Sequence, residues 1–117
     1  MLDPDQFEHA VEEALEGLPP QFASLLENVA VVIEEEPSAD DLELIEEGGE
    51  LLGIFRGVPR TYRAWGALPI LPTQIAIFRR PILRVTRSRT DAVRQIRDTV
   101  IHELGHYFGL SDEAMPY

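Results

Sequence analysis

Two histidines near the C-terminus stand four residues apart, and a glutamate directly follows the first. His102, Glu103 and His106 form the pattern H-E-x-x-H. On a helix this spacing is slightly more than one turn, so both imidazoles project from the same face and can bind one zinc ion. Glu103 lies beside the pair, where its carboxylate can accept a proton from metal-bound water. The pattern therefore predicts hydrolytic zinc chemistry.

A catalytic zinc usually has three protein ligands and keeps its fourth position for water. Our candidate for the third ligand is Asp112. Gly109 can adopt the left-handed conformation that ends a helix, which lets the chain turn back and present Asp112 to the ion. The alternative is a histidine pair that meets helical spacing by coincidence. The H-E-x-x-H pattern arises by chance in roughly one in a few hundred chains of this size, and the added glycine and aspartate make coincidence about a hundredfold rarer.

The run from His102 through Gly109 to Asp112 resembles the extended zinc signature of the metzincin side of the zincin metallopeptidases, with aspartate where most members carry a third histidine. The short chain, its acidic N-terminal part and the terminal motif resemble the small bacterial mini-zincins, which consist of little more than the active-site scaffold. The resemblance implies that His102, His106 and Asp112 bind zinc and that Glu103 is the general base.

Larger metzincins also have a methionine turn beneath the metal, well downstream of the signature. Here Met115 follows Asp112 almost at once, which leaves no room for the usual intervening segment. The ending from Ala114 to Tyr117 resembles such a turn, and the alternative is a short apolar tail packed on the core.

Length and composition predict a single domain over residues 1–117, with enough apolar residues for a core. The chain contains no cysteine, which excludes disulfides and thiolate zinc ligands and is typical of a reducing cytoplasm. The acidic start lacks the basic and apolar regions of a signal peptide, and no run reaches the length of a membrane span. We therefore expect a cytoplasmic protein.

The charge is divided unevenly along the chain. Residues 1–55 contain sixteen acidic residues and no lysine or arginine, whereas residues 56–117 contain ten arginines and five acidic residues, so the halves carry −16 and +5 within a total of −11. The total argues against bulk nucleic acid or an anionic membrane as a partner. Seven arginines between Arg79 and Arg97 could bind RNA or an acidic partner, but neutralisation of the acidic half is the more economical interpretation.

The N-terminal half predicts two helices and a strand. Asp3, Pro4 and Gln6 have the spacing of a helix start, and the apolar positions that follow repeat at helical spacing until Gly17. A short helix is predicted next, over 21–26. Residues 28–33 follow it and predict an interior strand, because they are rich in β-branched residues. Acidic residues 40–50 are typical of a solvated turn or short helix.

Two further strands are predicted at 51–57 and 74–79, separated by an irregular loop that contains Trp65. Trp65 could line a substrate cleft, although core packing is the commoner role. In zincins an edge strand beside the active-site helix binds extended substrate, and by resemblance and chain order our candidate is 74–79.

The last predicted element is a helix that carries the H-E-x-x-H pattern. Ser88 and Asp91 have capping-box spacing and open a helix that can continue to Phe108. One face is apolar (Val93, Ile96, Val100, Leu104 and Phe108), and the other is polar (Gln95, Thr99, His102 and His106). The helix should therefore bury one side and present the other to a polar cleft.

Together these elements predict an α+β fold in which a small, mostly antiparallel sheet packs on the C-terminal helix. We expect a zinc metallopeptidase that acts on a peptide or protein substrate. Two other classes stay open: a metal-stabilised binding or regulatory protein, which would tolerate loss of Glu103, and an arginine-mediated RNA or protein adaptor, which would not need metal.

Overall fold

A computed structural model of the chain describes residues 1–43, 50–56 and 73–107. Its N-terminal helix, α1 (Pro4–Glu16), begins as the sequence predicts. The Asp3 carboxylate accepts a hydrogen bond from the Gln6 backbone N–H at 2.8 Å, and the Gln6 side chain accepts one from the Asp3 N–H at 2.9 Å. Each side chain thus satisfies an N–H that the first turn leaves unpaired.

Two short turns then lead into the first strand. The predicted helix over 21–26 is split into α2 (Pro20–Ala23) and the 3₁₀ helix η1 (Ser24–Asn28), and strand β1 (Ala30–Glu34) follows. Part of the acidic stretch folds as the short helix α3 (Ala39–Glu43), and the strand predicted at 51–57 is β2 (Gly53–Arg56). Trp65 and the rest of its predicted loop up to residue 72 lie outside the described residues.

The fold is α+β, as predicted, but the described sheet is mixed rather than mostly antiparallel. Strand β3 (Gln74–Phe78) lies in the middle of the order β1-β3-β2, parallel to β1 and antiparallel to β2. A long connection separates β1 from β3, so no hairpin forces the two to run in opposite directions. Within the described sheet the predicted strand positions were wrong: 74–79 is central rather than at the edge, and the strand predicted at 28–33 is at the edge.

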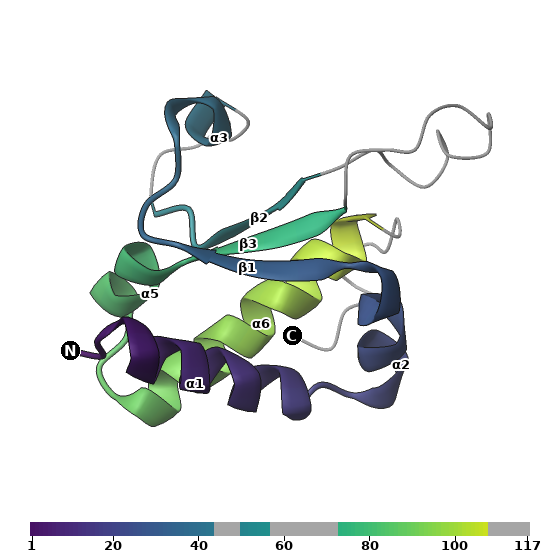
Figure 1. The fold of residues 1–117 in the computed structure, drawn as a ribbon, viewed down its shortest axis with the longest axis horizontal. Coiled ribbons are helices and arrows are strands. Elements are labelled where there is room, and N and C mark those ends of the chain that lie inside the picture. The colour runs from purple at the N-terminus through teal and green to yellow at the C-terminus, as the bar shows by residue number, and fades with distance from the viewer. Residues whose placement is uncertain (44–49, 57–72, 108–117) are drawn as a thin grey trace.

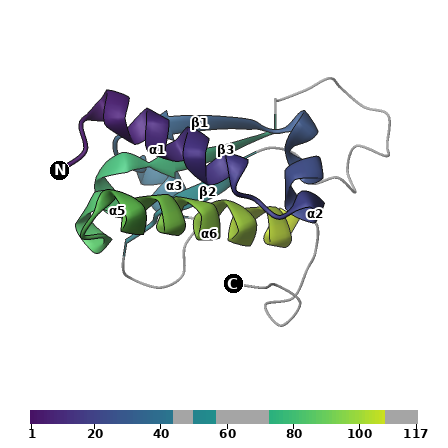
Figure 2. The same cartoon turned by 90° about the horizontal axis from the view of Figure 1, so that it is seen from below.

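The central position of β3 follows from its uninterrupted apolar sequence. Ile75 and Ile77 face the main core, which also contains α1 residues, whereas Ala76 and Phe78 pack with Ile54 on the other face of the sheet. A strand buried on both faces reads as continuous apolar residues rather than as an alternation. Helices α1 and α6 (Arg89–Tyr107) pack side by side against the first of these faces (Figures 1 and 2).

Helix α5 (Arg79–Val85) was not predicted, because Pro81 suggested only the end of a strand. Pro81 lies in the first turn of α5, where backbone N–H groups have no intrahelical acceptor, so proline costs no hydrogen bond there. In the parts of the chain that the structure describes, no helix is both long and apolar enough to cross a membrane.

Arginines of the second half of the chain pair with acids of the first half. Three consecutive glutamates each pair with a different arginine: Glu34 with Arg56, Glu35 with Arg79, and Glu36 with Arg84. These pairs confirm, for the residues involved, that part of the arginine charge neutralises the acidic half. They also join the end of β1 to β2, and the two residues after β1 to α5.

Arg56 is the most connected of these arginines. Its guanidinium donates to Glu34 at 2.8 and 2.9 Å and to Asp41 at 2.7 and 3.2 Å. Only 7% of the Asp41 side chain is exposed. Burial raises the pKa of Asp41, but hydrogen bonds from Arg56 and Ser38 outweigh it and lower the pKa below its ordinary value. The ionised carboxylate of Asp41 therefore depends on Arg56.

We expect Arg56→Ala to lower the free energy of unfolding by about 3–5 kcal/mol at neutral pH, because it leaves Asp41 buried without its cation. Since the folded pKa of Asp41 is lowered, the stabilisation is complete above its unfolded pKa of about 3.9 and is lost as pH falls below that value. Urea unfolding at pH 7 and at pH 3 to 4 measures both effects. Arg80→Ala is the control, since Arg80 is 59% exposed and should cost less than about 1 kcal/mol. Equal losses in the two variants would contradict the prediction.

Candidate functional site

Helix α6 carries the H-E-x-x-H residues and is fixed at its start and along its buried face. The Ser88 hydroxyl accepts a hydrogen bond from the Asp91 N–H at 3.0 Å, and the Asp91 carboxylate accepts one from the Arg87 N–H at 3.0 Å. The predicted capping at Ser88 is confirmed, with Arg87 in place of Ser88 as the second donor. Of the predicted apolar face, Ile96, Val100 and Leu104 are fully buried and Val93 is partly buried; Phe108 lies outside the described residues.

His102 and His106 lie together on the exposed side of α6. Their ring centroids are 4.3 Å apart, and the ring planes meet at 69°. The His106 side chain is 53% exposed. The predicted pair of adjacent imidazoles on one helix face is thus present. The third predicted ligand, Asp112, lies outside the described residues, as do Gly109 and Met115.

Glu103 points from α6 toward β2 rather than into solvent. Its Oε1 accepts a hydrogen bond from the Phe55 backbone N–H at 2.8 Å, and its Oε2 lies 3.8 Å from His106 Nδ1. Only 18% of its side chain is exposed. Burial raises the pKa of Glu103, and the Phe55 hydrogen bond and the two histidines partly oppose that rise. The carboxylate is therefore held in place by one oxygen, with the other near the imidazole pair.

The close packing of β2 on α6 depends on Gly53. A Cβ at this position would lie 2.7 Å from Thr99 Cγ2 and 3.0 Å from the Ala76 carbonyl oxygen, so a side chain there would push the strand away from the helix. That displacement would remove Phe55 from Glu103. Sequence reasoning gave neither Gly53 nor Phe55 a role, although a glycine inside a strand often marks a close approach.

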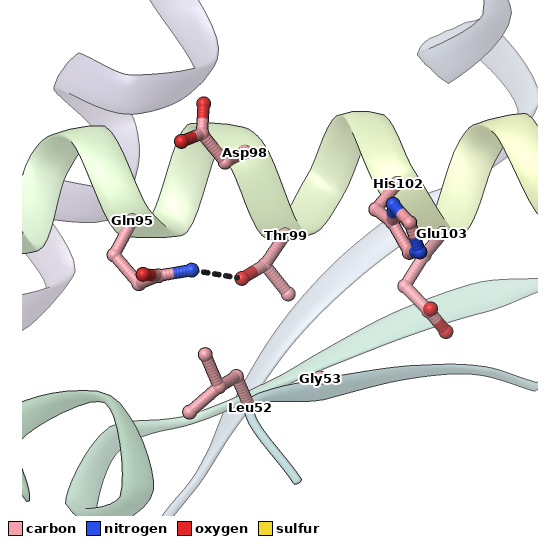
Figure 3. A pocket seen from close by; sticks show the side chains of 7 residues that line it. All are labelled: Leu52, Gly53, Gln95, Asp98, Thr99, His102 and Glu103. Atoms are coloured by element: carbon pink, nitrogen blue, oxygen red, sulfur yellow. Dashed lines mark hydrogen bonds between the residues drawn. The ribbon is translucent and has the colours of Figure 1, made fainter. Parts of the chain in front are cut away.

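A groove of about 290 Å³ adjoins Glu103 (Figure 3). Leu52 and Gly53 form its strand side, Gln95, Asp98 and Thr99 line it along α6, and His102 and Glu103 close one end. The Gln95 amide donates to the Thr99 hydroxyl at 3.3 Å. The predicted polar face of the helix therefore does border a cavity.

The donor set fits a zinc ion at the histidine pair. The two imidazoles at i and i+4 offer nitrogen ligands of the kind that zinc prefers. The neighbouring Glu103 carboxylate is oriented by the Phe55 backbone N–H. Within residues 1–43, 50–56 and 73–107, no three histidine, cysteine or acidic side chains gather closely enough to hold a metal. The described part thus offers two candidate ligands, and a zinc site would need a third from elsewhere.

Comparisons with known proteins show which family the chain belongs to. The chain resembles in structure a conserved hypothetical protein from Thermus thermophilus, with 28% sequence identity and a TM-score of 0.59 over 92% of this chain and 94% of that one. No curated protein matches it significantly. The family model for zincin-like metallopeptidases matches residues 26–117, which include β1 to α6 and the whole H-E-x-x-H pattern. This chain therefore belongs to the zincin-like metallopeptidase family.

Proposed function

We propose that this protein is a zinc-dependent peptidase in which Glu103 is the general base. The observation that carries the proposal is the position of Glu103, which is largely buried, anchored by the Phe55 N–H and adjacent to two exposed histidines. A site that only stored metal would not need an oriented carboxylate next to its ligands.

The residues that would hold zinc are His102, His106 and Asp112. When bound, zinc supplies Lewis acidity that activates water and polarises the carbonyl of the scissile bond. Glu103 takes the proton from the attacking water and delivers it to the leaving amine. Because Phe55 occupies Oε1, the proton is handled at Oε2, the oxygen nearer His106. The raised pKa of Glu103 suits a group that must both accept and release a proton.

An extended substrate is proposed to lie along the outer edge of β2. This strand replaces 74–79 as the candidate for substrate binding. The Phe78 N–H donates to the Leu52 carbonyl, and Ile54 and Arg56 continue this pairing with β3 at every second residue. The backbone groups of Gly53 and Phe55 therefore point away from β3, as the bond from Phe55 to Glu103 shows. The Phe55 N–H already donates to Glu103, so a peptide along this edge would lie beside the catalytic carboxylate without pairing with that N–H.

Removal of zinc should abolish hydrolysis, and its return should restore it. The experiment incubates zinc-loaded protein with a library of internally quenched peptides before and after 1,10-phenanthroline treatment and then after zinc addition. Metal content and melting temperature are measured at each step, since a ligand that binds only the folded state raises the melting temperature. Hydrolysis that persists in metal-free protein, or no hydrolysis by the zinc-loaded protein, would contradict the proposal.

A further inference from the structure

The groove beside Glu103 has an amide side chain on its helix side. Gln95 and Thr99 point from α6 toward Leu52 and Gly53 on the strand side (Figure 3). The Gln95 amide donates to the Thr99 hydroxyl at 3.3 Å, so the hydroxyl fixes the position of the amide. Neither residue is a proposed zinc ligand or takes part in the proposed proton transfer. The pair is therefore available for another role in the groove.

Gly53 leaves this groove accessible to a peptide that lies along the outer edge of β2. Side chains on a strand alternate between its two faces. Ile54 packs on the face of the sheet away from the main core, whereas a Cβ at Gly53 would lie 2.7 Å from Thr99 Cγ2 on α6. A peptide residue beside Gly53 would have its side chain on the same face as Gly53, directed toward α6. Because His102 and Glu103 close one end of the groove, that residue lies at or next to the cleaved bond.

The Gln95 amide determines which side chain fits beside it. One of its N–H groups donates to Thr99, which leaves the second N–H and the carbonyl oxygen to face a ligand. A primary amide such as that of glutamine matches this edge, because it also offers one acceptor and one donor. Lysine and arginine side chains only donate, and ionised carboxylates only accept, so neither kind can pair with both groups.

The other residues of the groove favour the same ligand. Glu103 would repel an acidic side chain, and among the described residues that line the groove there is no arginine or lysine to offset this repulsion. A basic side chain would pair with Glu103 and occupy the general base. An apolar side chain would exclude water from Gln95 without replacing its hydrogen bonds. The groove's 290 Å³ equals about ten water molecules at ~30 Å³ each, which is enough for a side chain as long as glutamine.

From this geometry we infer that Gln95 is a specificity residue that selects a glutamine side chain of the substrate, at or next to the cleaved bond. The inference rests on the proposed peptidase function, which it narrows from peptides in general to peptides with a neutral amide at this position. Thr99 is a positioning residue, because it acts through Gln95.

The test measures hydrolysis of acetylated and amidated alanine–glycine octapeptides by zinc-loaded protein. Each peptide carries one glutamine, and the series moves it through the sequence. Norleucine replaces it with a chain of similar length that lacks the amide, glutamate with the same shape and a charge, and lysine with a cation. At the best position we expect kcat/KM for glutamine to be about tenfold higher than for the other three, mainly through a lower KM, because the contact forms on binding.

Variants of the pair show whether this preference depends on it. Gln95→Leu should make glutamine and norleucine peptides equal without slowing hydrolysis of the norleucine peptide. Gln95→Glu removes the N–H donors and keeps acceptors, so it should favour lysine over glutamine. Thr99→Val keeps a methyl group beside Gly53 and should lose part of the glutamine preference. Gln21→Leu and Thr90→Val make the same changes at exposed positions and should keep the preference.

Binding of the same peptides to zinc-loaded Glu103→Gln protein separates this inference from the peptidase proposal, and melting temperatures show which variants are folded. Equal use of glutamine and norleucine, a preference for glutamate or lysine, or a glutamine preference that survives Gln95→Leu would overturn the inference, and hydrolysis in these cases would leave the peptidase proposal intact. Glutamine-selective binding that requires Gln95, without hydrolysis by the wild type, would keep Gln95 as the glutamine-binding residue and contradict the peptidase proposal. Neither binding nor hydrolysis of any peptide would overturn both.

Discussion

Glu103→Gln should lower kcat for peptide hydrolysis by about 10² to 10⁴-fold, the usual contribution of a positioned acid or base. Glutamine keeps the carbonyl oxygen that can accept from the Phe55 N–H, so the contact between α6 and β2 should survive. It cannot take a proton from water. The loss should therefore appear in kcat and kcat/KM to a similar degree, as expected when an interaction needed only in the transition state is removed.

Steady-state kinetics on the best library peptide, together with zinc content and melting temperature, separate the role of Glu103 from a structural one. Glu12→Gln makes the same chemical change on the exposed face of α1 and should leave all three quantities unchanged. Full activity in Glu103→Gln would refute the mechanism. Full zinc binding by both proteins, without hydrolysis by the wild type, would favour the metal-stabilised binding or regulatory protein that the sequence left open.

Helices α1 and α6 were predictable because the sequence patterns that define them are local. Asp3 with Gln6, and Ser88 with Asp91, are capping patterns contained within four residues, and the apolar repeats that follow them span single elements. The adjacency of His102 and His106 follows from helix geometry alone. The confirmed predictions, the two helices and the adjacent imidazoles, are therefore those that one helix specifies without the rest of the fold.

The arrangement of the strands could not be predicted, because it depends on contacts between distant segments. Residues 74–79 were assigned to the edge from chain order, but Ile75 and Ala76 are buried on opposite faces and place this strand in the centre. Phe55 lies 48 residues before Glu103, and no local pattern connects them. Only Gly53 gave a signal, since a glycine within a strand indicates that something packs closely against it.

The division of charge was visible in the composition, but the pairing was not. Counting predicted that the arginines would neutralise the acidic half, whereas the partners depend on β1, α3 and β2 meeting at Arg56. Asp41 was expected in a solvated stretch and is instead buried against this arginine. A run of acidic residues in the sequence therefore does not distinguish a solvated surface from a paired one.

Zinc analysis should find one ion per chain in the wild-type protein, and alanine at His106 or Asp112 should weaken binding by more than about 100-fold. Mutating even an outer partner of a metal ligand costs about 10 to 100-fold, so loss of a direct ligand should cost more. Removing His106 leaves a single imidazole on α6, whereas removing Asp112 leaves the pair seen here, with centroids 4.3 Å apart. The two variants therefore test the described ligands and the predicted one separately.

Untagged protein should be used for this measurement, with zinc affinity determined by competition against a chelator of known strength. His9→Ala is the matched control, because His9 is exposed on α1 and should leave zinc binding unchanged. Tight zinc binding in Asp112→Ala, with loss in His106→Ala, would keep the histidine pair and reject Asp112 as the third ligand. Wild-type protein that binds no zinc after reconstitution would remove the basis for hydrolysis at this site, because Glu103 would then have no activated water to deprotonate.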